Sequence, residues 1–203
     1  MKGLERVYSS QQLATRVASL GRTISRDYAD RTVDVVVMLD SAFVFAADLV
    51  RHISGRVVCH FVHTEVRDVH FGRHERREIR FGRQPRLENC DVLVVDAVIQ
   101  SGLTQDFLLK RLQESCPRSL RLAVLFDKAA DRRVDLKPDY FCFAGASKYL
   151  AGYGLAGSRG WYRNLPYIGV QPRPVRSSTR GRVRNVRDVR TEQINRGGSK
   201  RAR

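Results

Sequence analysis

Residues 92–104 read VLVVDAVIQSGLT and combine the residue types that bind phosphate. An apolar run ends at Asp96, and a short loop with Ser101, Gly102 and Thr104 leads into a predicted helix. Backbone N–H groups at a helix N-terminus attract phosphate, and the helix dipole adds to that attraction. Two hydroxyls and a glycine that lets the backbone come close therefore predict a phosphate-binding loop. The alternative is an ordinary strand–turn–helix in which Ser101 or Thr104 only caps the helix.

The segments around this loop alternate between strands and helices. Residues 9–31 carry an apolar stripe at helical spacing, opened by Ser9 or Ser10 as the N-cap. Continuous apolar runs rich in β-branched residues predict strands buried on both faces. The predicted strands are 33–39, 56–63, 91–99, 120–127 and 138–144, and the further helices are 43–53 and 104–115. This alternation predicts an α/β fold with a mostly parallel, twisted sheet flanked by helices.

A parallel sheet of this kind binds ligands at the carboxyl ends of its strands. The segments that follow Leu39, Asp96 and Asp127 are therefore the candidate site. The polar and basic stretch 68–86 separates two predicted strands. We expect it to form a mobile hairpin or a long loop.

The composition limits the class of protein. The chain has 203 residues, 42% of them hydrophobic, which is enough for one domain with a buried core. A run of about 18 apolar residues is absent, as is an apolar signal segment, so we expect a cytoplasmic protein without a membrane span. The cysteines are far apart, which favours free thiols over a zinc site. Cys59 and Cys142 lie in apolar runs and are expected to be buried.

Positive charge is concentrated at the C-terminus. The chain has a formal net charge of +16, and residues 171–203 hold eleven basic residues against two acidic ones. Lacking aromatic residues, this segment is predicted to be a disordered basic tail after a domain at 1–170. The tail could bind RNA or DNA through Arg180, Arg182, Arg184, Arg187 and Arg190. A merely solvated basic surface, an acidic membrane surface and an acidic protein partner are the alternatives.

VLVVDAVIQSGLT resembles the phosphoribosyl-pyrophosphate (PRPP) motif of purine phosphoribosyltransferases. In that motif two adjacent acids end the strand, a third acid follows three residues later, and Ser/Thr-Gly-x-Thr closes the loop. RVASLGRTISRDYADR, AFVFAADLVRHI, LFDK followed by KPDY, KYLAGYGL and YRNLPYIGV are similar to bacterial hypoxanthine phosphoribosyltransferases. The resemblance implies the type I phosphoribosyltransferase fold, with a five-stranded parallel core, a small hood and a mobile loop. It also implies a homo-oligomer, either a dimer or a tetramer.

The resemblance assigns roles to several residues. It implies that Asp96 holds the ribose hydroxyls and that Ser101, Gly102 and Thr104 hold the 5′-phosphate. It further implies that Lys128 contacts the purine 6-oxo group, that Tyr149 stacks on the base, that the Leu150 backbone meets the purine edge, and that Arg163 lies near the pyrophosphate. Three of these assignments have structural alternatives. Lys128 could be a solvated lysine at a strand end, Tyr149 could be part of the core, and Asp96 could cap the next turn.

The departures from the family pattern fall on metal and pyrophosphate chemistry. Ala97 replaces the second acid, and Gln100 replaces the acid that serves as the general base. Ala156 occupies the position of an aspartate that holds the second magnesium. In the pyrophosphate loop, Asp40 and Ser41 stand where a lysine and a glycine are usual. We find no match for the Ser-Tyr pair of the mobile loop.

These departures together favour a protein that has kept a purine-nucleotide site and lost most or all transferase activity. The expected ligands are a purine mononucleotide, IMP or GMP, or PRPP, and the basic tail suggests a regulatory or nucleic-acid-associated role. Two alternatives stay open. One is a divergent but active purine phosphoribosyltransferase that needs magnesium, with Asp48, Glu65 or Asp68 replacing the lost acids. The other is a structural subunit whose pocket binds nothing.

Overall fold

Parallel strands form the centre of the molecule. The computed structural model describes residues 4–71, 74–81, 85–145 and 149–170. A six-stranded sheet has the order β4-β3-β2-β5-β6-β7. Its strands are β2 (Val33–Leu39), β3 (Val57–Phe71), β4 (His74–Phe81), β5 (Asp91–Ile99), β6 (Ser119–Asp127) and β7 (Tyr140–Ala144). All neighbours pair in parallel except β3 and β4, which are antiparallel. The predicted α/β fold with a five-stranded parallel core is confirmed.

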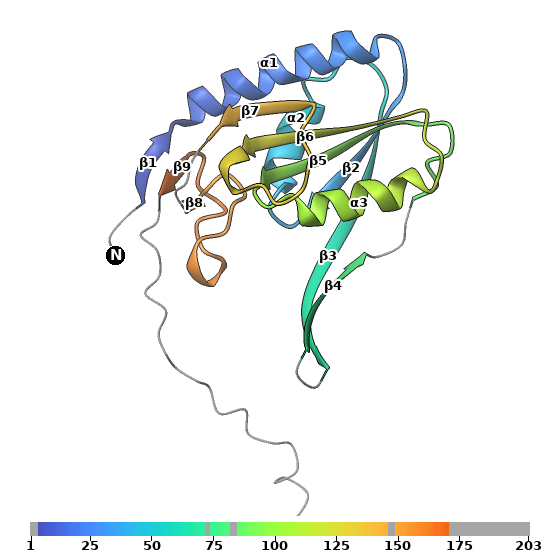
Figure 1. Cartoon of the computed structure of the whole chain (residues 1–203). Helices are drawn as coiled ribbons and strands as arrows, with labels where there is room; N and C mark the ends of the chain where they lie inside the picture. Colours follow the sequence, from blue (N-terminus) through green and yellow to red (C-terminus); the bar gives the residue numbers. More distant parts are fainter. Residues whose placement is uncertain (1–3, 72–73, 82–84, 146–148, 171–203) are drawn as a thin grey trace, which may run out of the picture. The chain divides into compact units, whose positions relative to one another are not determined.

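Helices cover both faces of this sheet (Figure 1). α1 (Ser10–Tyr28) and α2 (Phe43–Val50) bury their apolar sides in one core cluster, and α3 (Leu103–Gln113) packs into a second cluster. Ser9 is the N-cap of α1: its Oγ accepts from the Gln12 N–H at 3.2 Å, and Gln12 Oε1 accepts from the Ser9 N–H at 2.8 Å. This reciprocal pair satisfies two N–H groups that a helix start leaves open. Of the described helices, none has the length and apolar character to cross a membrane.

A second, smaller sheet forms the hood. Its three antiparallel strands have the order β1-β9-β8, with β1 (Glu5–Tyr8), β8 (Leu150–Ala151) and β9 (Ile168–Val170). β9 pairs with both β1 and β8, so the two ends of the described chain meet here. Two short 3-10 helices, η1 (Ala129–Asp131) and η2 (Ser158–Gly160), lie in the loops after β6 and β8.

Some sequence-based expectations differ from the structure. The strand expected at 56–63 continues to Phe71, because its second half pairs with β4. β3 and β4 form a hairpin, which was one of the two structures expected for 68–86. The helix expected at 43–53 ends at Val50. Cys142 is buried as expected, but Cys59 is exposed. β3 is the outermost parallel strand, and α2 packs mainly on β2 and β5, so the apolar run around Cys59 is not covered on both faces.

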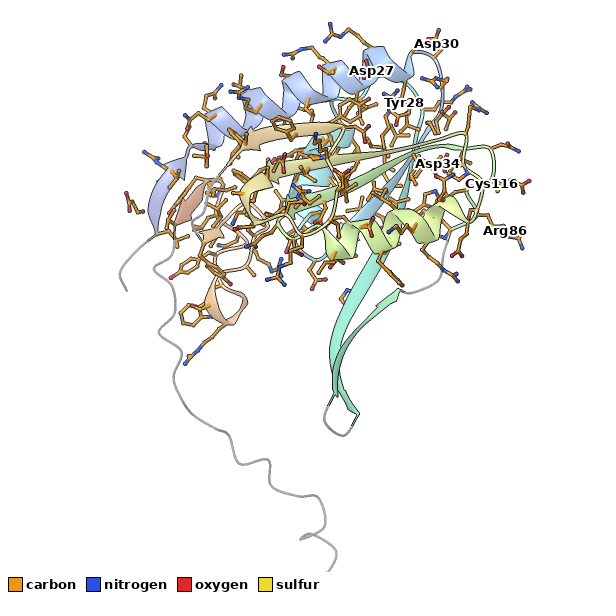
Figure 2. All side chains as sticks on the ribbon, viewed as in Figure 1. Asp27, Tyr28, Asp30, Asp34, Arg86 and Cys116 are labelled. Atoms are coloured by element: carbon orange, nitrogen blue, oxygen red, sulfur yellow. The ribbon has the colours of Figure 1, made fainter. Side chains whose placement is uncertain are left out.

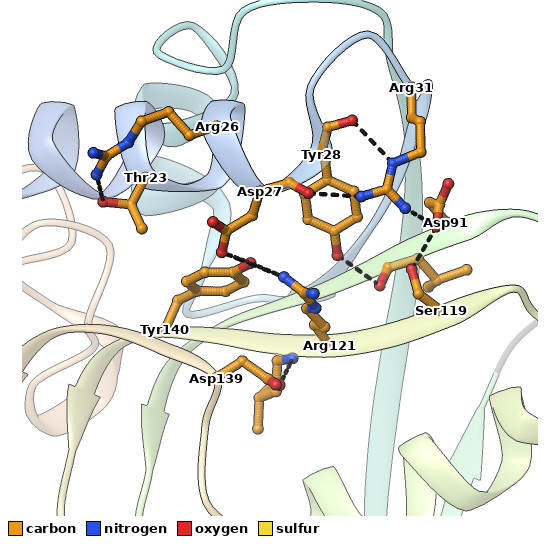
Figure 3. Close-up of polar contacts among 12 residues, drawn as sticks. Thr23, Arg26, Asp27, Tyr28, Arg31, Asp91, Ser119, Arg121, Asp139 and Tyr140 are labelled. Atoms are coloured by element: carbon orange, nitrogen blue, oxygen red, sulfur yellow. Dashed lines mark hydrogen bonds and ion pairs between the residues drawn. The ribbon is translucent and has the colours of Figure 1, made fainter.

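The amino ends of the strands hold a polar network (Figure 3). Asp91, at the start of β5, accepts hydrogen bonds from Arg31, Arg118 and Ser119. Tyr28 donates to the Val92 carbonyl at 3.4 Å. Residues labelled in Figure 2 gather at this end of the sheet: Asp27, Tyr28, Asp30, Asp34, Arg86 and Cys116. The candidate site lies at the opposite, carboxyl ends.

Candidate phosphate and purine site

The loop between β5 and α3 depends on a left-handed glycine. Gly102 is the N-cap of α3, with φ 78° and ψ −8°, a conformation that favours glycine. A Cβ at this position would lie 2.8 Å from Val134 Cγ2 and 3.0 Å from Arg132 Cδ, so the space is filled as well. The N-cap makes no side-chain hydrogen bond, and the Leu103 N–H lies 3.5 Å from Ser101 Oγ, at the limit of a bond. Side-chain capping by Ser101 is therefore weak, and the helix start is open to an anion.

A pocket of about 460 Å³ opens beside this loop. Its lining comes from the β5–α3 loop and from the loop after β6: Gln100, Ser101, Leu103, Ala130, Asp131, Arg132 and Arg133. Backbone bonds hold the two loops together, because the Arg133 N–H donates to the Ser101 carbonyl at 2.9 Å and the Lys128 N–H donates to the Ile99 carbonyl at 3.0 Å. The phosphate loop and the following loop therefore form one assembly.

Two arginines of this assembly have different environments. Arg132 forms an ion pair with Asp127 and donates to the Leu136 carbonyl at 2.8 Å, and both ion-pair side chains are largely buried. Its charge is therefore matched within the protein. Arg133 is exposed and lines the pocket. Arg133 and the N-terminus of α3 supply positive charge on one side of the pocket, and Asp131, which also lines it, supplies a negative charge.

Asp96, the acid that the resemblance assigns to the ribose, is buried, with an exposed fraction of 9%. Its Oδ1 accepts from the Ala97 N–H at 2.6 Å, and its Oδ2 accepts from Gln105 Nε2 at 2.5 Å. Burial raises the pKa of Asp96 to about 6, against the opposing effect of these hydrogen bonds. Both oxygens thus have partners within the protein. Ala97 is fully buried in the core.

Gln105 is a residue that sequence reasoning missed. It is a polar residue in the first turn of α3 and has an exposed fraction of only 7%. Besides Asp96, its Nε2 also donates to the Val98 carbonyl at 3.3 Å. Gln105 lies on the same buried side of α3 as Leu108 and Leu112. A polar side chain at such a position is the sequence signal that could have indicated a buried partner for Asp96.

Gln100 lies in the pocket and contacts a second residue that the sequence did not reveal. Its Nε2 donates to Asp131 Oδ2 at 3.0 Å. Lys128, three residues before Asp131, is partly buried. Burial lowers the pKa of Lys128, and the negative charge of Asp131 acts in the opposite direction. Gln100, Lys128 and Asp131 therefore belong to one polar cluster at the ends of β5 and β6.

The positions that the resemblance assigns to the purine, Tyr149 and Leu150, lie at the edge of the hood. Tyr149 has an exposed fraction of 46%, which contradicts the alternative that it is part of the core. Leu150 is buried and pairs with Val170 in the hood sheet. An exposed ring next to a fixed strand can present a flat surface to a base.

The pyrophosphate positions meet around Gly154. Arg163 donates to the Gly154 carbonyl at 2.7 Å, and a Cβ on Gly154 would lie 2.8 Å from the Ser41 carbonyl oxygen. This places the loop with Ala156 against the loop that follows β2. Asp40 is exposed, and its Oδ1 lies 3.5 Å from His63 Nδ1. Gly154 is thus a shared neighbour of Ser41 and Arg163, two of the positions that the resemblance assigns to the pyrophosphate region.

Oxygen donors are few at the positions that the resemblance assigns to magnesium. The side chains at positions 97 and 156 are hydrocarbon, and both oxygens of Asp96 are bonded to the protein. Over the described ranges, no three His, Cys, Asp or Glu side chains come together as a metal site.

The five nucleic-acid candidates, Arg180, Arg182, Arg184, Arg187 and Arg190, lie outside the described residues.

Comparison with known proteins identifies the family. Residues 3–154 match the phosphoribosyl transferase domain. The chain belongs to the phosphoribosyltransferase family. It is 31% identical to the hypoxanthine-guanine phosphoribosyltransferase of Streptococcus mutans over 166 residues, which cover 81% of this chain and 91% of that protein. The corresponding Bacillus subtilis protein is 29% identical over 162 residues, or 80% and 89% of the two chains.

Solved structures agree with this assignment. The crystal structure of a hypoxanthine-guanine phosphoribosyltransferase from Bacillus anthracis matches with a TM-score of 0.75 and 30% identity, covering 85% of this chain and 100% of that chain. The chain therefore has the type I phosphoribosyltransferase fold and belongs to a family similar to the bacterial hypoxanthine-guanine phosphoribosyltransferases.

Proposed function

We propose that this phosphoribosyltransferase binds a purine mononucleotide, IMP or GMP, in the site at the carboxyl ends of β5 and β6, with weak or absent phosphoribosyl transfer. One observation carries the proposal: the phosphate loop opens onto a pocket, whereas Asp96 is sealed between Ala97 and Gln105. The loop proposed to bind phosphate is thus accessible, whereas both carboxylate oxygens of Asp96 already accept hydrogen bonds from the protein.

The phosphate half of the proposal rests on Gly102 and Arg133. The left-handed Gly102 turns the chain so that α3 starts at the pocket without a side-chain cap. Arg133 adds an exposed guanidinium, which binds phosphate with two parallel hydrogen bonds. Ser101 and Thr104 are the hydroxyls expected to complete this subsite.

The purine half rests on Tyr149 and Lys128. Tyr149 offers an exposed ring for stacking, and Lys128 offers an ammonium group beside the pocket assembly. An ammonium donates only, so it fits the 6-oxo acceptor of hypoxanthine or guanine rather than the amino group of adenine. The base preference proposed here is therefore a 6-oxopurine.

Weak transfer follows from four substitutions. A general base contributes typically about 10²- to 10⁴-fold to a rate, and position 100 holds an amide. Asp40 places a negative charge in the pyrophosphate region, where it repels a pyrophosphate group. Neither position 97 nor position 156 offers an oxygen for magnesium.

A thermal unfolding titration tests the binding proposal. IMP or GMP at about 100 times its Kd should add about 2.7 kcal/mol to the free energy of unfolding. For a chain of this length, that corresponds to a Tm increase of roughly 5–10 °C. Arg133→Ala should reduce the increase, whereas Arg22→Ala, an exposed arginine on α1, should not. Absence of any increase at millimolar nucleotide would favour the structural-subunit alternative.

An active transferase is the second candidate, and the contact between Gln100 and Asp131 favours it, since it places a carboxylate beside the position that lost one. Pyrophosphate release from PRPP with hypoxanthine or guanine and magnesium measures this activity. We expect turnover far below the range of about 1–10³ s⁻¹ that is typical of enzymes. Turnover within that range would establish the active enzyme instead.

We further propose that residues 171–203 attach the domain to RNA or DNA. These residues contain eleven of the basic groups and two acidic ones, so they can displace counterions from a phosphate backbone. The affinity of the full chain for a 30-mer duplex should fall steeply with salt concentration. The same measurement on a chain ending at residue 170 should give a much shallower slope, and an equal slope would contradict the proposal.

A further inference from the structure

We propose that Asp131, held against Gln100, supplies the carboxylate that position 100 lacks, and that its contact at purine N7 favours the base of a free 6-oxopurine over the base of the corresponding nucleotide. The inference rests on the purine site proposed above. It adds the residue that decides which form of the purine is bound.

The position of Asp131 is fixed by the backbone. Its N–H donates to the Lys128 carbonyl at 3.1 Å, which closes the single turn of η1 and brings its carboxylate back toward the end of β6. The next residues anchor this turn: Arg132 pairs with Asp127, and the Arg133 N–H bonds the Ser101 carbonyl at 2.9 Å. Asp131 is therefore carried on a segment that is held at both sides.

The contact between Gln100 and Asp131 also orients the amide. A carboxylate only accepts hydrogen bonds, so the Gln100 amino group must face Asp131 Oδ2. The amide itself cannot take up a proton at neutral pH, but it holds the carboxylate close to its own position. A negative charge is thus present in the pocket, displaced from residue 100 to residue 131.

Other acids near the carboxyl ends of the strands have different partners. Asp127 is paired with Arg132, Asp96 is sealed by Gln105, and Asp40 lies beside His63. Of the described residues that line the pocket, Asp131 is the only acidic one. The ligand-facing carboxylate of this site is therefore Asp131.

The chemistry of the base explains the selectivity. The 6-oxo group and N7 of a purine lie next to each other on one edge of the base. Lys128 supplies a donor for the oxygen, and Asp131 supplies an acceptor for a proton on N7. Free hypoxanthine and guanine can carry that proton. In IMP and GMP, N9 is substituted and N7 carries a bare lone pair, which a carboxylate repels.

Isothermal titration calorimetry with hypoxanthine and with IMP tests the inference on the full chain. Asp131→Asn should weaken hypoxanthine binding roughly 10-fold, because a charge-assisted hydrogen bond is lost. The same substitution should strengthen IMP binding several-fold, because an asparagine amide can donate to N7. The ratio of the two dissociation constants should therefore change by more than about 10-fold.

Two further variants separate selectivity from structure. Asp135→Asn neutralises another exposed acid of the same loop that does not line the pocket, and it should leave the ratio unchanged. Gln100→Leu removes the contact that holds Asp131, so it should weaken hypoxanthine several-fold and affect IMP less. Equal effects of Asp131→Asn on both ligands would overturn the inference while the purine site stands. Wild-type protein that binds neither ligand would overturn the proposed purine site together with the inference.

Discussion

The amino and carboxyl ends of the same strands use charge in opposite ways. At the amino ends, Asp91 is almost fully buried, with an exposed fraction of 2%, and accepts from two arginines and a serine. At the carboxyl ends, Asp131 and Arg133 are exposed and line a pocket. Charges that are matched inside the protein contribute to its stability, and charges left toward solvent can meet a ligand. The amino ends therefore use their charges for stability, and the carboxyl ends leave charges available to a ligand.

A second group at the amino ends shows the same matching. Tyr140 donates to Asp27 at 2.7 Å, and Arg121 contacts both residues (Figure 3). Burial raises the pKa of Tyr140 to about 12, and its hydrogen bond to Asp27 acts in the same direction. The tyrosine stays neutral and donates across the physiological range. This group joins the end of α1 to the starts of β6 and β7.

Breaking the amino-end network should have the largest effect on stability. Asp91→Ala removes the acceptor for Arg31, Arg118 and Ser119, and the joint loss of three hydrogen bonds to a charged group should lower the free energy of unfolding by about 3 kcal/mol. Urea unfolding measures the change. Asp30→Ala, an exposed acid just after α1, is the control and should cost less than about 0.5 kcal/mol. If Asp91→Ala cost no more than Asp30→Ala, the amino-end network would not contribute to stability, and the contrast with the carboxyl ends would be wrong.

Asp96 is the exception at the carboxyl ends, because it is buried and bonded like the acids of the amino ends. Its pKa is raised from 3.8 to about 6, so the folded protein holds this proton more tightly than the unfolded chain. The resulting stabilisation is present below pH 4 and is lost as the pH rises through 6. A difference of this size corresponds to about 3 kcal/mol.

Unfolding of the wild type and of Asp96→Asn between pH 4 and 7.5 isolates this effect. The stability of the wild type relative to the variant should fall by about 2 kcal/mol over this range. A constant difference would mean that the pKa of Asp96 is unshifted, so that burial does not outweigh the hydrogen bonds from Ala97 and Gln105, and the predicted pH dependence would be wrong.

A pair of glycine substitutions gives the smallest effect and concerns the phosphate loop alone. Gly102→Ala and Gly160→Ala both place a side chain at positive φ, 78° and 80°, at a cost of about 1–2 kcal/mol. Only Gly102 has neighbours within 4 Å of the new Cβ, so its substitution should cost about 1 kcal/mol more. Chemical unfolding compares the two variants. Equal costs would show that Val134 and Arg132 move aside easily.

Predictions from the sequence succeeded where the deciding interactions are local. The β-branched run of β2 and the cap of α1 depend on residues within one element, and both are present. The prediction for Cys59 was wrong because its burial depends on which helix covers β3. Asp131 and Gln105 were missed for a related reason. Their partners Gln100 and Asp96 are 31 and 9 residues away in the chain.

The sequence by itself determined the family and the alternation of strands and helices in the parallel core, and it predicts a phosphate-binding loop at Ser101, Gly102 and Thr104. These follow from periodicity and from short motifs, which are properties of neighbouring residues. Only the tertiary structure decided which charged side chains are buried with hydrogen-bond partners and which are exposed to solvent. That outcome depends on distances between side chains from different strands and loops, such as Gln105 beneath Asp96 and Asp131 beside Gln100.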